Sequence, residues 1–136
     1  MNDHQSMVKD FMISFGQDCP ETFTPDSFPG PLRASLIVEE AQEFCDAVHA
    51  EDWPGVVDAI CDLLYVTYGA AVALGIDVEP FFAEVHASNM SKLDPVTHRP
   101  TYREDGKVMK PSTYTPAEIK QLMLSIYGRG FLESDV

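Results

Sequence analysis

The sequence contains few cysteines and few basic residues, and both scarcities exclude whole classes of protein. Only three cysteines occur among the 136 residues, too few and too scattered for a disulfide framework or a paired-cysteine metal site. We therefore expect a reducing cytoplasm as the location. Nine Lys and Arg residues stand against 22 Asp and Glu residues, which gives a net charge of -13. So acidic a chain is unsuited to a nucleic-acid polymer or an anionic membrane surface as its main partner.

Long uncharged segments are also missing. The longest, residues 63–76, has 14 residues, fewer than the roughly 20 that a membrane-spanning helix needs. The N-terminal residues lack the basic and apolar regions of a signal peptide. We therefore expect no membrane partner and a single domain over residues 1–136, large enough to bury a core.

Helical periodicity dominates the first 90 residues. Apolar spacing, with caps and stops, predicts helices over about residues 3–15, 31–49, 53–74 and 78–89. A capping box, Thr115 to Glu118, indicates a last helix that begins there and ends at Gly128. Asp105-Gly106 favours a short hairpin, and the tail after Arg129 is expected to be loose. The prediction is an all-α fold, a four- to five-helix bundle with at most one small hairpin near residues 101–109.

Carboxylates occupy unusual positions on two of these helices. At 100° per residue, Glu40 falls inside the apolar arc of its helix and Glu43 on the rim, whereas Glu39 points to the other side. Asp58 and Asp62, four residues apart, share one face of the next helix, which is otherwise uncharged. A carboxylate removed from water is costly unless it is paired or bound to a cation. Neither helix contains a Lys, so we expect a metal site in the core of the bundle.

Basic residues gather in the loop after the fourth helix. Five of the nine lie there: Lys92, Arg99, Arg103, Lys107 and Lys110. In so acidic a chain, this clustering indicates phosphate contacts from that loop and from the end of the helix, where Asn89 and Lys92 face the same way. The alternative is a solvated loop whose charges balance Glu104 and Asp105, and it applies most to Arg99 and Arg103.

The acidic pattern resembles a known family. Glu39-Glu40-Ala41-Gln42-Glu43 is an EExxE motif, and Asp58 to Asp62 follows 15 residues later. The resemblance extends through Thr67-Tyr68-Gly69, Leu74 to Asp77, Phe82 to His86, Asn89 to Lys92 and Gly106 to Pro111. These segments, about 80 residues in the family's order, resemble the MazG-like all-α nucleoside triphosphate pyrophosphohydrolases. That superfamily includes dimeric dUTPases and phosphoribosyl-ATP pyrophosphohydrolases.

The resemblance implies an enzyme that converts a nucleoside triphosphate to the monophosphate and pyrophosphate, and that assembles as a homodimer or homotetramer. It implies two or more Mg²⁺ or Mn²⁺ ions, which favour carboxylate and phosphate oxygens. The expected metal ligands are Glu40, Glu43, Asp58 and Asp62. The expected catalytic residues are Glu39, Glu40 and Glu43, with Glu39 as the candidate that holds or deprotonates the attacking water. The expected phosphate-binding residues are Asn89, Lys92, Lys107 and Lys110.

The second acidic motif departs from the family pattern. That motif is usually ExxD, which needs a Glu at position 59, where this chain has Ala59. Asp58 lies one residue earlier and keeps both carboxylates on one face, although Asp is shorter and rotated by 100°. We predict that Asp58 takes the place of the missing Glu as the fourth ligand.

The base pocket is the least defined part of the prediction. Phe11, Phe15 and Trp53 are candidates for stacking on a base, although aromatic residues at helical spacing are more often core. The substrate stays open between dGTP or GTP and dUTP.

Two other functions remain as alternatives. One is a metal- or nucleotide-binding module without turnover. The other is a di-metal carboxylate oxidoreductase, whose Glu-x-x-His motif has its nearest match in Asp46-x-x-His49, on the side away from Glu40.

Overall fold

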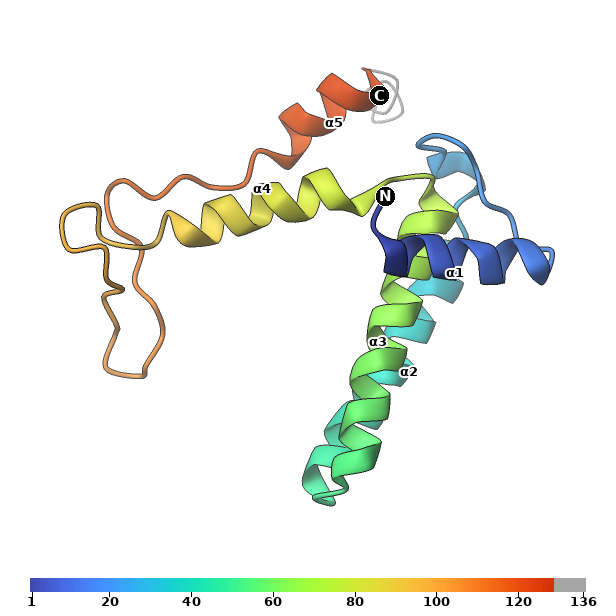
Figure 1. Cartoon of the computed structure of the whole chain (residues 1–136), viewed down its shortest axis with the longest axis horizontal. Helices are drawn as coiled ribbons and strands as arrows, with labels where there is room; N and C mark the ends of the chain where they lie inside the picture. Colours follow the sequence, from blue (N-terminus) through green and yellow to red (C-terminus); the bar gives the residue numbers. More distant parts are fainter. Residues whose placement is uncertain (129–136) are drawn as a thin grey trace. The chain divides into compact units, whose positions relative to one another are not determined.

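Residues 1–128 are described in the computed structural model, and they form α-helices joined by loops (Figure 1). The five helices are α1 (Asp3–Ser14), α2 (Gly30–His49), α3 (Trp53–Leu74), α4 (Val78–Met90) and α5 (Ile119–Tyr127), with a short 3₁₀ helix at Pro25–Ser27. Within the described residues, β pairing is limited to one antiparallel bridge between Tyr102 and Val108. The all-α prediction and the small hairpin are confirmed. The expectation for the tail after Arg129 lies outside the described residues.

The chain divides into two compact units, Met1–Val78 and Glu79–Val136. The first contains α1, α2 and α3, and the second contains nearly all of α4 together with the loop that follows and α5. The expectation of a single domain over residues 1–136 stays a prediction. The predicted metal ligands all lie in the first unit, so its packing decides the geometry of the site.

In the first unit, α2 and α3 form an antiparallel hairpin whose helices lie side by side (Figure 1). The Asp52 side chain caps α3 by accepting a hydrogen bond from the Gly55 backbone N–H at 3.1 Å. Gly75 ends α3 with φ +81°, and a Cβ there would lie 1.9 Å from the Thr22 carbonyl oxygen. Only glycine fits this position, because both the backbone angle and the close approach of the loop exclude a side chain.

Helix α1 packs against the end of this hairpin. Its Val8 and Met12 form the buried core with Val72 and Ala73 of α3. Gln5 is fully buried, so both ends of its amide need partners. Its Nε2 donates to the Ile76 carbonyl at 2.7 Å, and its Oε1 accepts from the Val78 backbone N–H at 3.1 Å.

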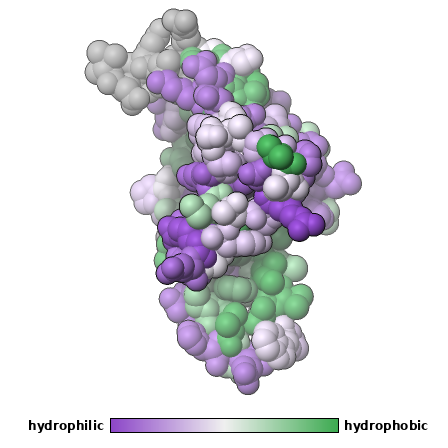
Figure 2. Space-filling model, turned by 90° about the vertical axis from the view of Figure 1, so that its left-hand side faces the viewer, coloured by the Kyte–Doolittle hydropathy of each residue, from purple (hydrophilic) through white to green (hydrophobic). Residues whose placement is uncertain are grey.

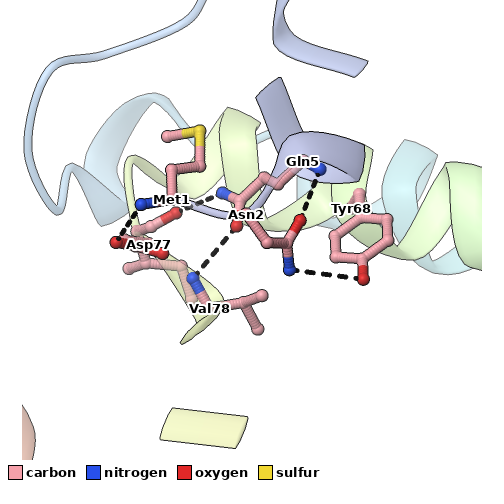
Figure 3. A network of polar contacts seen from close by, with 7 residues as sticks. Met1, Asn2, Gln5, Tyr68, Asp77 and Val78 are labelled. Carbon is pink, nitrogen blue, oxygen red and sulfur yellow. Dashed lines mark hydrogen bonds and ion pairs between the residues drawn. The ribbon is translucent and has the colours of Figure 1, made fainter. Parts of the chain in front are cut away.

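Figure 3 shows the polar network around Gln5, which includes an ion pair at 3.0 Å between the N-terminal amine and Asp77. A helix N-terminus leaves its first backbone N–H groups without partners inside the helix. Gln5 Oε1 accepts from one of these groups, the Val78 N–H at the start of α4. Hydrophobic packing and this amide together hold α1 on α3.

The predicted start of the last helix is wrong. Helix α5 begins at Ile119, and the residue before it, Glu118, makes no side-chain capping bond. Other partners hold the backbone of the expected capping box. The Thr115 N–H donates to Ser91 Oγ at 2.9 Å, and the Glu118 N–H donates to Glu84 Oε1 at 3.0 Å. These tertiary contacts bind the N–H groups that a capping box would satisfy, and the helix begins only at Ile119.

Helix α3 leaves much of its apolar surface uncovered. It is long and apolar enough to cross a membrane by length and composition alone, although soluble core helices pass the same test, and 28% of its most apolar window is buried. Figure 2 shows apolar side chains gathered over the lower part of the molecule, where the α2–α3 hairpin lies. Four residues at helical spacing, each 45–63% exposed, form what we term the α3 row: Trp53, Val57, Ile60 and Leu64.

Candidate metal centre

Three of the four predicted metal ligands come together between α2 and α3. Glu40, Glu43 and Asp62 each offer a carboxylate oxygen, and these oxygens all lie within 4.8 Å of one another. Glu40 and Glu43 are three residues apart and therefore project from one side of α2, while Asp62 comes from the antiparallel neighbour α3. Glu40 and Asp62 are half-buried and Glu43 is exposed. The cluster is thus partly shielded and open at the Glu43 side.

The electrostatics of this cluster disfavour its negative charge. Burial, hydrogen bonding to Glu43 and the nearby charges of Glu43, Asp62 and Glu39 raise the pKa of Glu40 above its usual range. Burial, the charges of Asp58 and Glu43, and a hydrogen bond with Asp58 raise the pKa of Asp62 in the same way. Glu40 Oε2 is also buried without a hydrogen-bond partner in the described part of the chain.

An orphaned carboxylate oxygen among like charges is what a bound cation would relieve. The donor set consists of carboxylate oxygens alone, and these are the ligands that Mg²⁺ and Mn²⁺ prefer. The residues present therefore fit a hard divalent cation. Asp46 and His49 do not belong to the cluster, and Asp46 Oδ1 instead accepts a hydrogen bond from Gln42 at 2.8 Å. The cluster thus lacks the histidine that the oxidoreductase alternative requires.

Asp58 lies beside this cluster without belonging to it. The side chain is exposed, its charge acts on Asp62, and it lines a cleft of about 380 Å³ together with Glu43 and Asp46. Ala59, at the position where the family usually has Glu, is only 4% exposed. The prediction that Asp58 is the fourth ligand stays a prediction. Its carboxyl group already lies within hydrogen-bond reach of Asp62.

If Asp58 is a ligand, Asp58→Asn should reduce turnover of a nucleoside triphosphate by roughly a hundredfold, because one strong electrostatic stabiliser is lost. It should also weaken the thermal stabilisation that Mn²⁺ confers. Asp46→Asn is the matched control, since Asp46 lines the same cleft outside the cluster. Near-normal turnover in Asp58→Asn would show that Asp58 only neighbours the site.

The other catalytic candidate, Glu39, is exposed on α2, and its charge contributes to the raised pKa of Glu40. It is therefore close enough to act on the same site while remaining open to water. This placement suits a residue that holds or deprotonates a water molecule.

The predicted phosphate-binding residues lie in the second unit. Asn89 is exposed in the last turn of α4, and Lys92 is half-buried in the turn that follows. Lys107 and Lys110 are exposed near the Tyr102–Val108 bridge, with the Lys110 ammonium 4.7 Å from the Tyr114 ring centroid. Arg103 pairs with Asp105, its Nε donating to Oδ1 at 3.1 Å. For Arg103, this pair favours the alternative of a solvated loop whose charges balance, and that alternative stays a prediction.

The aromatic candidates for base binding do not form one platform within the chain. The rings of Phe11 and Phe15 are 4.4 Å apart, and Phe11 meets Tyr65 of α3 edge-on at 5.6 Å. Trp53 is exposed at the start of α3. Twelve residues of helix, about 18 Å, separate Trp53 from Tyr65. Phe11 and Phe15 therefore lie on a different part of the surface from Trp53.

Sequence reasoning also missed a residue, Arg33 of α2, which is half-buried and lines a cavity next to α3. A signal for it exists in the composition, because Lys9 and Arg33 are the only Lys or Arg among residues 1–78. Arg33 is the only arginine in this acidic segment, and it stands out once charges are counted by segment.

The fold and the site define an all-α protein with a carboxylate cluster between two antiparallel helices, a design suited to divalent cations. The model of the phosphoribosyl-ATP pyrophosphohydrolase family matches residues 8–89. The chain belongs to this family, within the MazG-like all-α nucleoside triphosphate pyrophosphohydrolase superfamily. The resemblance is confirmed. The family supports a nucleotide pyrophosphohydrolase kind of activity and is typically metal-dependent.

A similar sequence occurs in Acanthamoeba polyphaga mimivirus. The chain is 34% identical over 77 residues to the uncharacterized protein L479 of that virus. The match covers 53% of this chain and 31% of the viral protein, so the chain spans about a third of the length of this relative.

Proposed function

We propose that the protein is a metal-dependent pyrophosphohydrolase that converts a (deoxy)nucleoside triphosphate to the monophosphate and pyrophosphate. The observation that carries this proposal is the Glu40, Glu43 and Asp62 cluster, which lies inside the segment that matches the family. The substrate candidates are dGTP or GTP and dUTP. The proposed cofactor is Mg²⁺ or Mn²⁺, with two or more ions per site.

The proposed mechanism assigns a task to each group of residues. Glu40, Glu43, Asp62 and Asp58 would hold the ions, which neutralise phosphate charge and make bound water more acidic. Glu39 would orient the attacking water and accept its proton. The charged and amide side chains of the second unit would orient the triphosphate: Asn89, Lys92, Lys107 and Lys110. Catalysis would then rest on positioning and charge stabilisation, as in phosphoryl transfer generally.

The proposal includes an assembly and a location. A second copy of the chain would cover the α3 row, giving a homodimer or a homotetramer, because an exposed row of large apolar residues is unfavourable in water. Three free cysteines, two of them exposed, suit the reducing cytoplasm. A charge of -13 argues against nucleic-acid polymers and anionic membranes as partners.

Product analysis tests the reaction. With Mg²⁺ or Mn²⁺ and a panel of nucleoside triphosphates, we expect monophosphate and pyrophosphate in equal amounts, measured by ion-exchange chromatography. A Glu40→Gln preparation purified in parallel controls for contaminating phosphatases. Release of orthophosphate with a diphosphate left over would place the cleavage elsewhere. Tight nucleotide binding without any product would favour the non-catalytic binding module.

A further inference from the structure

Arg33 is a half-buried cation, and among residues 1–128 it has no carboxylate partner. Residues 1–78 contain 14 Asp and Glu residues against two Lys and Arg residues, so an acidic partner would be easy to provide. Within residues 1–128, however, the hydrogen bond of the guanidinium goes to a neutral group, from Nη2 to Gln17 Oε1 at 3.1 Å. Its Nε is buried without a partner. A guanidinium has five N–H donors, so Arg33 can bind further acceptors besides Gln17.

Gly69 makes room for this guanidinium on α3. The glycine is buried in the middle of the helix, where glycine is less favourable than alanine by roughly 0.5–1 kcal/mol. A Cβ at this position would lie 2.8 Å from Arg33 Nη1. An alanine would therefore displace the end of the Arg33 side chain, which is flexible, without disturbing the backbone.

Arg33 lines a cavity of about 420 Å³. The apolar residues of its wall are Pro29, Leu32, Leu36 and Ala73, and the polar ones are Gln17, Asp18, Ser27 and Arg33 itself. A free phosphate would meet the Asp18 carboxylate and gain nothing from apolar walls. A fitting ligand offers acceptors to Arg33, donors to Asp18 and a flat apolar body.

The cavity lies at a defined distance from the carboxylate cluster. Arg33, Leu36 and Glu40 follow one face of α2 at helical spacing. Arg33 meets α3 at Gly69, and Glu40 meets it at Asp62. On both helices the separation is seven residues, or about 10 Å. A nucleotide spans a comparable length from its innermost phosphate to the far edge of its base.

We propose that this cavity is the base subsite of the enzyme and that it selects guanine, an inference that rests on the proposed function. Guanine presents two adjacent acceptors, O6 and N7, which match the forked donors of a guanidinium. Its N1–H and 2-amino group are donors suited to Asp18. At the position of guanine O6, adenine and cytosine carry an amino group, which is a donor and does not match a guanidinium. Uracil has the O4 carbonyl there, but its neighbour is a C–H group, so it lacks the second acceptor that N7 provides in guanine. Leu32 and Leu36 supply apolar contacts for the ring.

Steady-state kinetics with base analogues test the subsite. We expect the wild type to show a lower KM for dGTP than for dATP, dCTP and dUTP. Loss of N7 in 7-deaza-dGTP, or of the 2-amino group in dITP, should raise KM about five- to a hundredfold. Asp18→Asn should reduce the discrimination between dGTP and dITP, because the carboxylate that accepts from the 2-amino group is gone.

Two variants address Arg33 in different ways. Arg33→Gln should raise KM for dGTP about ten- to a hundredfold while changing KM for dUTP little. Gly69→Ala keeps the charge but displaces the guanidinium, so KM should rise in the same direction with helix stability preserved or improved. Lys9→Gln removes the only other Lys or Arg of residues 1–78 and serves as the control, with KM unchanged.

The outcomes separate this inference from the proposed reaction. Turnover of dUTP or dATP with a KM equal to that of dGTP would keep the reaction and overturn the guanine subsite. An unchanged KM for dGTP in both Arg33→Gln and Gly69→Ala would do the same. If no nucleotide is hydrolysed, the reaction fails, and calorimetric binding of dGTP with Ca²⁺ decides the subsite alone. Preferential dGTP binding that Gly69→Ala weakens would support it, and equal binding of the nucleotides would overturn it.

Discussion

Glu40→Gln is expected to reduce turnover by about a hundred- to a thousandfold, the effect of losing one preorganised electrostatic group. Glu40 is the half-buried member of the cluster whose Oε2 has no hydrogen-bond partner among residues 1–128, and a bound cation would supply that partner. Asp62→Asn should act about as severely, because Asp62 supplies the carboxylate from α3. The measurement is kcat with Mn²⁺ at saturating substrate, with Asp46→Asn as the control on α2.

Glu40→Gln should also have opposite effects on thermal stability in the absence and in the presence of metal. Without metal, Glu40→Gln should melt at a higher temperature than the wild type, because the amide removes a charge that burial, Glu43 and Asp62 all disfavour. With Mn²⁺, the wild type should gain stability and the variant should gain much less. Melting curves in chelator and in a Mn²⁺ series measure both effects. A variant that is stabilised by Mn²⁺ as strongly as the wild type would exclude Glu40 as a ligand.

Charging the α3 row is expected to abolish assembly. The wild type should have twice or four times the mass of its 15.1 kDa chain, measured by light scattering at micromolar concentration. Ile60→Asp combined with Leu64→Asp removes two large apolar side chains, each contributing about 1.5–3 kcal/mol when buried. It also places two carboxylates in the contact, so the double variant should run as a monomer.

The matched control is Val96→Asp, which charges an exposed apolar residue of the loop that follows α4. It should leave the mass unchanged. A monomeric wild type would refute the assembly, and an unchanged mass for the double variant would place the contact on another surface. Circular dichroism of the double variant distinguishes dissociation from unfolding.

The elements that sequence predicted well are those whose signals are local. Helix α3 begins at the Asp52 cap and ends at Gly75 as expected, because a side-chain oxygen and a left-handed glycine act within one turn. The side shared by Glu40 and Glu43 follows from their spacing of three residues. The capping box at Thr115 failed because its backbone N–H groups are bound by Ser91 and by Glu84, residues far away in the sequence.

The sequence by itself determined the all-α class, the family and the two helices that carry the carboxylates, since helical periodicity and motif spacing are properties of neighbouring residues. Only the tertiary structure decided which of these carboxylates meet. Asp62 joins Glu40 and Glu43, while Asp58 stays at the edge, because the register between α2 and α3 depends on packing across the hairpin. The same register brings Arg33 to Gly69. A lone arginine and a helical glycine, 36 residues apart, have no local signal that connects them, and only packing makes them one site.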